Sequence, residues 1–332
     1  MSAAWLIHCV KRIASPFALA ALVLSAAPNQ PARAAYPDRI IRIVVPLAPG
    51  GGTDAIARAL AQEMAKDMGG TAIIENRPGA GTIIGTQAVA TSEPDGYTLL
   101  LGTFANAVNP SLNAKLPYDA HKDFAPVALI ARSFNIVVVH PKSSFQSIAD
   151  LIAAAKAEPN RLSYGTYGTG TSAHLAGELF KSMAKVNMTT VPYKGASPAI
   201  TDLVGGQIQV MFTTVASAAS LIEGGQLRAL AVTSAERSPA FPQLPTVAEA
   251  GVPGYQVESW YGLFAPAKTP PEIIDRLNKS VAKAVQSETF RRLSVNEGLV
   301  MVASPPEELG RYFLGEEERW RKVIQDAGIK VE

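Results

Sequence analysis

Cysteine is almost absent from this sequence. Cys9 is the only one among 332 residues, and it lies in a leading segment that we expect to be removed. The remaining chain then has no disulfide, no cysteine nucleophile and no thiolate metal site. Its stability must come from an apolar core. Roughly 300 residues are enough for this, and by the usual size of domains they suggest about two of them.

After residue 34, the sequence also lacks any apolar run of the ~18 residues that a membrane span needs. The first 34 residues have the pattern of a signal peptide. Lys11 and Arg12 precede an alanine-rich apolar stretch at 13–27, and Ala32-Arg33-Ala34 supplies the small residues of a cleavage site. An uncleaved anchor is the disfavoured alternative, because the stretch is short. We therefore expect residues 1–34 to be cleaved near Ala34 and the protein to be soluble in the periplasm.

The sequence also lacks a large excess of either positive or negative charge. The net charge is +2, and losing Lys11, Arg12 and Arg33 makes it slightly negative. This argues against nucleic acid or an acidic membrane surface as the main partner. His121 and His140 have no carboxylate or cysteine at ligand spacing, so we expect neither a metal nor another cofactor.

What the sequence does contain is two series of alternating strands and helices. The first runs from a β-branched strand at 39–45 to a strand at 97–103, and the second from a helix at 147–159 to a strand at 227–234. Such alternation predicts parallel sheets covered by helices. Two proline-initiated helices form the tail. Extended apolar runs at 124–141 and 258–266 are the expected crossings between two lobes. One lobe would hold 35–135 and 259–332, and the inserted lobe 136–258, so that the lobes can close on a ligand.

Two glycine-rich loops each join a strand to a helix. The first is PLAPGGGTD at 46–54, where we expect Thr53 to cap the helix and Asp54 to lie in its first turn. The second is GTYGTGTSAH at 165–174, which is rich in hydroxyl groups. Taken alone, each loop is explained equally well as a tight turn between a strand and a helix. As a pair at strand ends in facing lobes, they predict a cleft with anion-binding N–H groups on both walls.

Over the whole length after residue 34, the sequence resembles the substrate-binding receptors of tripartite tricarboxylate transporters, also called Bug receptors. The matching segments are YPDRIIRIVVPLAPGGGTD, ENRPGAGTIIGTQAVA, PDGYTLLLGT, YGTYGTGTSAHLAGELF, VPYKGASPAITDLVGGQIQVMF, LRALAVTSAERSP, LPTVAEAG and WYGLFAPAKTP. The resemblance implies a two-lobed α/β periplasmic-binding-protein fold of type II. It also implies a monomer that binds a small carboxylate and delivers it to a two-protein membrane permease.

The resemblance also implies the ligand-binding residues. They are Leu47, Ala48, Gly51, Thr53 and Asp54 in the first loop, and Thr166, Gly170, Thr171, Ser172 and His174 in the second. Two positions depart from the family. Leu47 stands where an aromatic residue is frequent, so the side chain that forms one wall of the pocket is smaller, and the size of the ligand stays open. Thr213 stands where many members have an acid, so a plain carboxylate is favoured over an amino acid.

Several residues keep two interpretations. His174 is either a helix-surface histidine bonded to backbone or a ligand contact, and Asp54 is first a helix-start acid and then a ligand or water contact. Tyr193 and Lys194 either reach the cleft or belong to a turn. For Trp260, packing at the hinge is favoured over stacking on a ligand. An exported hydrolase is disfavoured, because Ser172 is in no G-x-S-x-G elbow and no acid–histidine pair accompanies it. We therefore expect no enzyme activity. A sensor that presents its closed form to a signalling protein remains the alternative to a transport receptor.

Overall fold

The computed structural model describes residues 36–329. The predicted signal peptide, its cleavage site and Cys9 lie outside the described residues. Residues from Pro37 onward belong to one compact unit.

The first series of strands and helices agrees with the predicted alternation. It contains β1 (Ile41–Val45), α2 (Gly52–Met68), β2 (Ala72–Asn76), a 3₁₀ turn η1 (Ala80–Thr82), α3 (Ile83–Ala90), β3 (Thr98–Thr103) and α4 (Phe104–Leu112). The apolar residues of α2 at four-residue spacing, Ile56, Leu60 and Met64, are all completely buried. The spacing therefore identified the buried face of this helix correctly.

The second series begins after a long strand, β4 (Phe124–Val139), which is the first of the two extended apolar runs. It contains α5 (Ile148–Ala157), β5 (Ser163–Thr166), α6 (Ser172–Ala184), β6 (Thr189–Pro192), α7 (Ala196–Val204), β7 (Val210–Thr214), α8 (Val215–Glu223) and β8 (Arg228–Val232). The second apolar run forms β9 (Glu258–Pro266). The tail contains α9 (Pro271–Val285), α10 (Glu288–Glu297), β10 (Val300–Met301) and α11 (Pro306–Asp326).

The strands join in the order β2-β1-β3-β9-β4-β7-β5-β6, with β8 and β10 also paired to β4. Strands β1, β2 and β3 are parallel to one another, as are β5, β6 and β7. The long strand β4 joins these two groups. Its first part, Phe124–Phe134, pairs with β9, and its end, Asn135–Val139, pairs with β7 and β8. The two extended runs thus lie side by side between two parallel groups.

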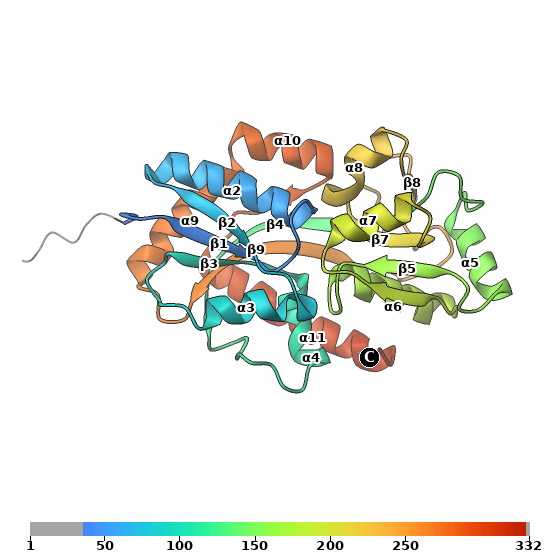
Figure 1. Cartoon of the computed structure of the whole chain (residues 1–332), viewed down its shortest axis with the longest axis horizontal. Coiled ribbons are helices and arrows are strands. Elements are labelled where there is room, and N and C mark those ends of the chain that lie inside the picture. Colours follow the sequence, from blue (N-terminus) through green and yellow to red (C-terminus); the bar gives the residue numbers. More distant parts are fainter. Residues whose placement is uncertain (1–35, 330–332) are drawn as a thin grey trace, which may run out of the picture. The chain divides into compact units, whose positions relative to one another are not determined.

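Helices cover both faces of the β1–β3 group (Figure 1). Helices α2 and α9 pack together on one face, whereas α4 and α11 pack together on the other. Trp320 of α11 meets Phe104 of α4 edge to face, with ring centroids 4.8 Å apart. Trp260 of β9 is completely buried against Phe264, Tyr312 and Phe313. Among residues 36–329, no helix has both the length and the apolar character needed to cross a bilayer.

Two helices did not appear in the sequence-based description. Asn106 and Pro110 argue against a helix in α4, yet a capping box between Thr103 and Asn106 starts it. Helix α10 has few apolar residues, and the Ser287 hydroxyl caps its first turn by accepting a bond from the N–H of Phe290. In both cases polar residues at the N-terminus mark the start of the helix.

The predicted N-cap of α2 was wrong. The helix begins at Gly52, its N-cap is Gly51, and no side chain caps it. Thr53 therefore lies inside the first turn. Glycine is acceptable at an N-cap position, and it leaves the backbone N–H groups of the first turn uncovered by a side chain of the loop.

Candidate functional site

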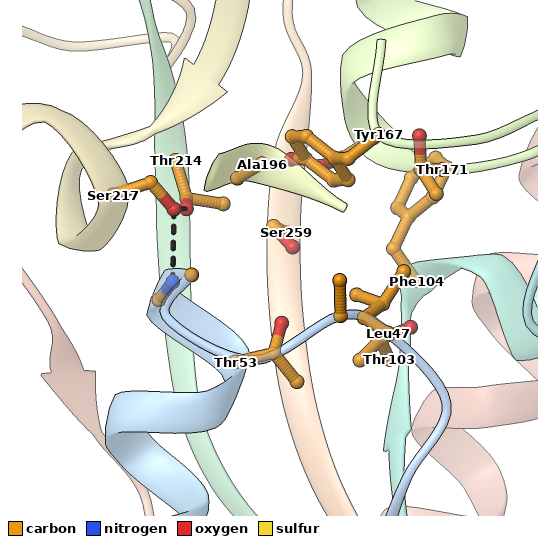
Figure 2. Close-up of a pocket in the computed structure, with 14 residues that line it drawn as sticks. Leu47, Thr53, Thr103, Phe104, Tyr167, Thr171, Ala196, Thr214, Ser217 and Ser259 are labelled. Carbon is orange, nitrogen blue, oxygen red and sulfur yellow. Dashed lines mark hydrogen bonds between the residues drawn. The ribbon is translucent and has the colours of Figure 1, made fainter. Parts of the chain in front are cut away.

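The ends of several strands and the beginnings of several helices surround one cavity (Figure 2). The space between its atoms, open solvent included, is about 420 Å³. Thr214 and Ser217 lie on one side, Thr171 and Phe104 on the other, and Ser259 of β9 between them. The lining comprises Leu47, Ala48, Gly51, Gly52, Thr53, Thr103, Phe104, Tyr167, Thr171, Ser172, Ala196, Thr214, Ser217 and Ser259.

The first glycine loop is held from outside itself. The N–H of Ala48 donates to the carbonyl of Lys194 at 3.1 Å, and the N–H of Gly52 donates to the hydroxyl of Ser217 at 2.9 Å. Ser217 also bonds to the Thr214 hydroxyl at 3.0 Å. Residues 46–54 are therefore fixed against the beginnings of α7 and α8, which are far away in the sequence.

Asp54 is buried but does not line the cavity. Its carboxylate accepts bonds from the N–H of Gly50 at 3.1 Å, the side-chain amide of Asn76 at 2.9 Å and the guanidinium of Arg58 at 2.8 Å. Burial alone raises the pKa of Asp54, but bonds from Arg58, Asn76 and Gly50 outweigh this and lower the pKa below its ordinary value. The first of the two interpretations of Asp54, a helix-start acid, is the one that these contacts favour.

The second glycine loop is held by its own side chains. The hydroxyl of Thr171 donates to the carbonyl of Gly168 at 2.6 Å, and the hydroxyl of Thr166 accepts from the N–H of Gly168 at 3.2 Å. The hydroxyls of Tyr167 and Ser172 are 2.7 Å apart. Thr171 and Ser172 line the cavity, whereas Thr166 and Gly170 do not.

His174 also serves this loop and does not line the cavity. Its ring is only 6% exposed, and its Nδ1 accepts a bond from the N–H of Gly170 at 3.2 Å. Burial lowers the pKa of His174, nearby Glu178 acts in the opposite direction, and Lys181 lowers it further. The bond to backbone agrees with the first of the two interpretations of His174, but the residue is buried and not on the helix surface.

Thr213 was predicted to contact the ligand but does not line the cavity, and the next residue, Thr214, lines it instead. Thr213 is completely buried, its hydroxyl has no hydrogen-bond partner among the described residues, and it is not part of the lining. Because side chains alternate along a strand, Thr214 at the end of β7 faces the cavity instead.

Sequence reasoning missed eight of the fourteen lining residues. The missed residues include Thr103 and Phe104 between β3 and α4, Ala196 at the start of α7, and Thr214 and Ser217 at α8. Like the glycine loops, all of these lie where a helix starts, in most cases directly after a strand. The general rule that ligands bind beyond the carboxyl ends of parallel strands would have found them. A search that relied on glycine-rich loops alone was too narrow to find these residues.

The remaining candidates lie outside the cavity. The hydroxyl of Tyr193 donates to Asp202 at 2.6 Å, and the side chain of Lys194 is exposed, so the turn explains both residues. Trp260 is packed in the core. The Ser172 hydroxyl is paired with a tyrosine and not with an imidazole, which gives no support to a serine hydrolase. Over residues 36–329, no group of His, Cys, Asp and Glu is arranged to hold a metal ion.

The lining has an unusual electrostatic character. Its residues within the described chain include no lysine, arginine, histidine, aspartate or glutamate. Helices α2, α6, α7 and α8 all begin at the cavity, and none of them has a side chain bonded as its N-cap. Helix beginnings carry a partial positive charge and free N–H groups. This arrangement favours an anion without using a cationic side chain.

Comparison with known sequences gives a consistent family. The sequence profile described as "Tripartite tricarboxylate transporter family receptor" (TctC) matches residues 56–329. A UPF0065 protein in the tcbD–tcbE intergenic region of Pseudomonas sp. (strain P51) is 40% identical over 291 residues, which cover 87% of each chain. Protein BugT of Bordetella pertussis is 37% identical over 298 residues, which cover 89% of this chain and 91% of BugT.

Solved structures agree with the sequence relatives. The periplasmic binding protein BugD has a TM-score of 0.87 at 33% identity, covering 90% of this chain and 100% of BugD. Rpa4515 of R. palustris, solved with adipate, has a TM-score of 0.85 at 38% identity, covering 89% and 99%. MatC from Rhodopseudomonas palustris, solved with malate, has a TM-score of 0.84 at 33% identity, covering 87% and 100%.

Proposed function

The chain belongs to the tripartite tricarboxylate transporter receptor family of periplasmic solute-binding proteins, and from this premise we propose that it captures a small carboxylate in the cavity described above. Its fold is the two-lobed α/β fold of periplasmic binding proteins. Adipate and malate in two of its structural neighbours are small dicarboxylates, and they support the class of ligand.

The observation that carries the proposal is the convergence of four helix beginnings on one cavity that has no charged side chain in its lining. A carboxylate would be held by backbone N–H groups and by hydroxyls such as those of Thr53 and Ser217. Hydrogen bonds to an ionised acceptor are stronger than neutral ones, so amides are sufficient for this role. A ligand ammonium would find no carboxylate in the lining to pair with.

We further propose that residues 35–135 with 259–332 form one lobe and 136–258 the other, with the cavity between them. At the first glycine loop, three hydrogen bonds then cross from lobe to lobe: Ala48 to Lys194, Gly52 to Ser217, and the hydroxyl of Ser197 to the carbonyl of Pro49 at 3.2 Å. These would form when the lobes close. Strands β4 and β9 supply the connections about which the lobes would turn.

In this proposal the protein is an exported monomer that delivers its ligand to the permease of a tripartite tricarboxylate transporter. A receptor that reports its closed state to a signalling protein would need the same cavity and the same closure. Uptake of the bound carboxylate in a deletion strain distinguishes the two: loss of uptake supports transport, and normal uptake with loss of the transcriptional response supports sensing.

The test of binding is a screen of the purified protein, lacking residues 1–34, against a library of carboxylates by thermal shift, followed by isothermal titration. The library contains adipate, malate, citrate and benzoate, with the amides of the same acids as matched neutral controls. We expect at least one acid to bind and its amide not to bind. Binding of an acid and its amide with equal affinity would contradict anion recognition by helix beginnings.

A further inference from the structure

The loop at 168–171 is confined from two directions. On one side, Thr171 lines the cavity. On the other side, Gly170 has a positive φ of 78°, and a side chain on it would lie 2.8 Å from the Asn109 side-chain oxygen of α4. The amide of Asn109 is itself bonded to the carbonyl of Gly81 at 3.0 Å. Within this confined loop, the N–H of Gly170 donates to Nδ1 of His174.

This hydrogen bond fixes the protonation state of the ring. Nδ1 can accept the N–H of Gly170 only when it carries no proton, so the ring is neutral with its proton on Nε2. His174 is the third residue of α6, where the helix dipole disfavours a positive charge. An imidazolium would point an N–H at the N–H of Gly170. The bond would be lost, and a buried backbone donor would have no acceptor.

The charged neighbours of His174 are known from the structure. On its own helix, Glu178 favours the protonated ring and Lys181 disfavours it. Glu178 is engaged by the hydroxyl of Tyr164 on β5 at 2.5 Å and by Lys181 at 2.9 Å. Burial raises the pKa of Tyr164 and of Tyr255 well above the ordinary value, so both phenols stay neutral. The largest influence on the ring is its own burial, which lowers the pKa of His174.

We propose that His174 is a positioning residue for ligand binding: its neutral Nδ1 holds the second loop in the shape that lines the cavity, and protonation of the ring releases the loop and weakens carboxylate binding. The inference rests on the proposed function for its effect on binding, but not for its effect on the loop. It assigns to His174 a role that requires no contact with the ligand.

The direction of the pH effect follows from the ring. A histidine whose pKa is lowered by its native surroundings binds fewer protons than it would when released, so its contribution is complete above the ordinary pKa of about 6.5 and is lost as the pH falls. An anionic ligand at the same helix beginning would favour the opposite change, because it attracts an imidazolium. The sign of the pH dependence therefore decides between loop positioning and direct electrostatic attraction.

The first measurement needs no ligand. Nuclear magnetic resonance would follow the His174 ring nitrogens and the Gly170 amide from about pH 8 to pH 5. We expect the Nε2–H tautomer at high pH, and the Gly170 amide to shift with the titration of the ring. In His174→Asn, whose side-chain oxygen can occupy the position of Nδ1, the Gly170 shift should disappear. A Gly170 amide that ignores the ring titration in the wild type would overturn the proposal.

The second measurement is the affinity for adipate, with malate as a second probe, at about pH 7.5 and pH 5. His174→Leu, which has no acceptor, should bind on the order of tenfold more weakly than the wild type at about pH 7.5, the loss expected for one buried hydrogen bond. The difference should narrow at about pH 5, because protonation of the ring removes the same bond from the wild type. His174→Asn should rescue binding and lose the part of the pH dependence that comes from the ring. Titration of the probe itself is common to all variants and cancels in this comparison.

The matched control is His140→Asn. The Nδ1 of His140 accepts the N–H of Lys142 at 3.0 Å in an exposed turn outside the cavity lining, so the chemical change is the same at an unrelated place. We expect its pH profile to follow the wild type. Equal pH dependence in the wild type and His174→Asn, or tighter wild-type binding at low pH, would refute the inference. If the wild type binds no carboxylate at either pH, the proposed function fails, and the Gly170 titration still decides whether His174 holds the loop.

Discussion

Both glycine loops contribute residues to the cavity lining, but different kinds of contact hold each loop in its conformation. The first loop, residues 46–54, contributes backbone to the cavity and is held mainly by partners outside it, namely Asn76, Ser217 and the carbonyl of Lys194, in addition to the bond from Gly50 to its own Asp54. The second, residues 165–174, is held by side chains that it supplies itself, through Thr166, Thr171 and His174. One loop depends on the rest of the molecule for its shape, whereas the other is largely self-contained.

This difference changes how a hydroxyl-rich loop should be interpreted. The hydroxyl of Thr171 lines the cavity, yet its proton is directed to the carbonyl of Gly168. Ser172 is likewise shared with Tyr167. A polar side chain beside a ligand site can therefore act by fixing the position of backbone N–H groups and not by contacting the ligand directly. The variants below test this comparison, from the largest expected effect to the smallest.

Asp54→Ala should be the most damaging change to the first loop. It leaves the N–H of the exposed Gly50 and the amide of the half-buried Asn76 without this acceptor, although the Asn76 amide keeps its bond to the carbonyl of Leu47. The free energy of unfolding should fall by about 2 kcal/mol, because hydrogen bonds to a charged group are lost. Arg58→Ala is the matched control. It removes only the ion pair with a guanidinium whose side chain is 57% exposed, and should cost at most about 1 kcal/mol. Urea denaturation measures both, and equal losses would mean that the ion pair, not the loop, matters.

The same carboxylate gives a pH dependence with a definite sign. Because the native pKa of Asp54 is lowered, its contribution is present above the unfolded value of about 3.9 and is lost as the pH falls below it. The difference in unfolding free energy between wild type and Asp54→Ala should therefore shrink in acid. Denaturation at about pH 7 and pH 3 tests this. A difference that is constant over that range would show that folding leaves the pKa of Asp54 unchanged.

Gly52→Ala tests how closely the first loop approaches its outside partners. A side chain at Gly52 would lie 2.6 Å from the Cβ of Ala216 and 3.1 Å from the hydroxyl of Ser217. Both contacts lie across the proposed cleft, so closure should cost ~1–3 kcal/mol more, which weakens carboxylate binding by roughly tenfold to a hundredfold. Gly315→Ala is the control, because this glycine of α11 has no atom near its added Cβ. Unchanged affinity in Gly52→Ala would exclude the close approach during binding.

Thr171→Val tests the self-contained loop. The change keeps the shape and removes the 2.6 Å bond to the carbonyl of Gly168, which should lower the unfolding free energy by about 1 kcal/mol. Binding should weaken by less than tenfold, since the backbone N–H groups remain. Thr201→Val removes a similar bond, to the carbonyl of Ser197, on an exposed helix turn and should have a smaller effect. If Thr171→Val abolished binding without loss of stability, its hydroxyl would be a direct ligand contact.

The fold was largely predictable from the sequence, because its signals are local. The β-branched and apolar runs at 124–141 and 258–266 became β4 and β9, and the first strands and helices were placed within a few residues. The periodicity of apolar residues needs no knowledge of distant partners. Helix α4 was missed because it contains Pro110, and α10 because it has few apolar residues; their starts depend on the Thr103–Asn106 capping box and on Ser287.

The site was predictable only in outline. The sequence located both glycine loops, and six of its eleven candidate residues line the cavity: Leu47, Ala48, Gly51, Thr53, Thr171 and Ser172. Which way a side chain points was not accessible, because Asp54 and His174 are turned toward partners that the fold brings to them. The contribution of α8 through Ser217 depends on a contact with Gly52 across 165 residues of sequence. No local pattern encodes that distance.

Lys194→Ala should have the smallest effect, and it separates recognition by amides from recognition by a cation. The side chain of Lys194 is exposed and does not line the cavity, and only its backbone carbonyl holds the first loop, through the N–H of Ala48. Alanine keeps that carbonyl, so affinity for a confirmed carboxylate should stay within about twofold of the wild type, below the effect of even one hydrogen bond. Raising the salt concentration should change both proteins equally, since surface charges are screened. Isothermal titration at low and high salt measures this. A large loss of affinity in Lys194→Ala, with Gly52→Ala unaffected, would show that a lysine and not the helix beginnings recognises the anion.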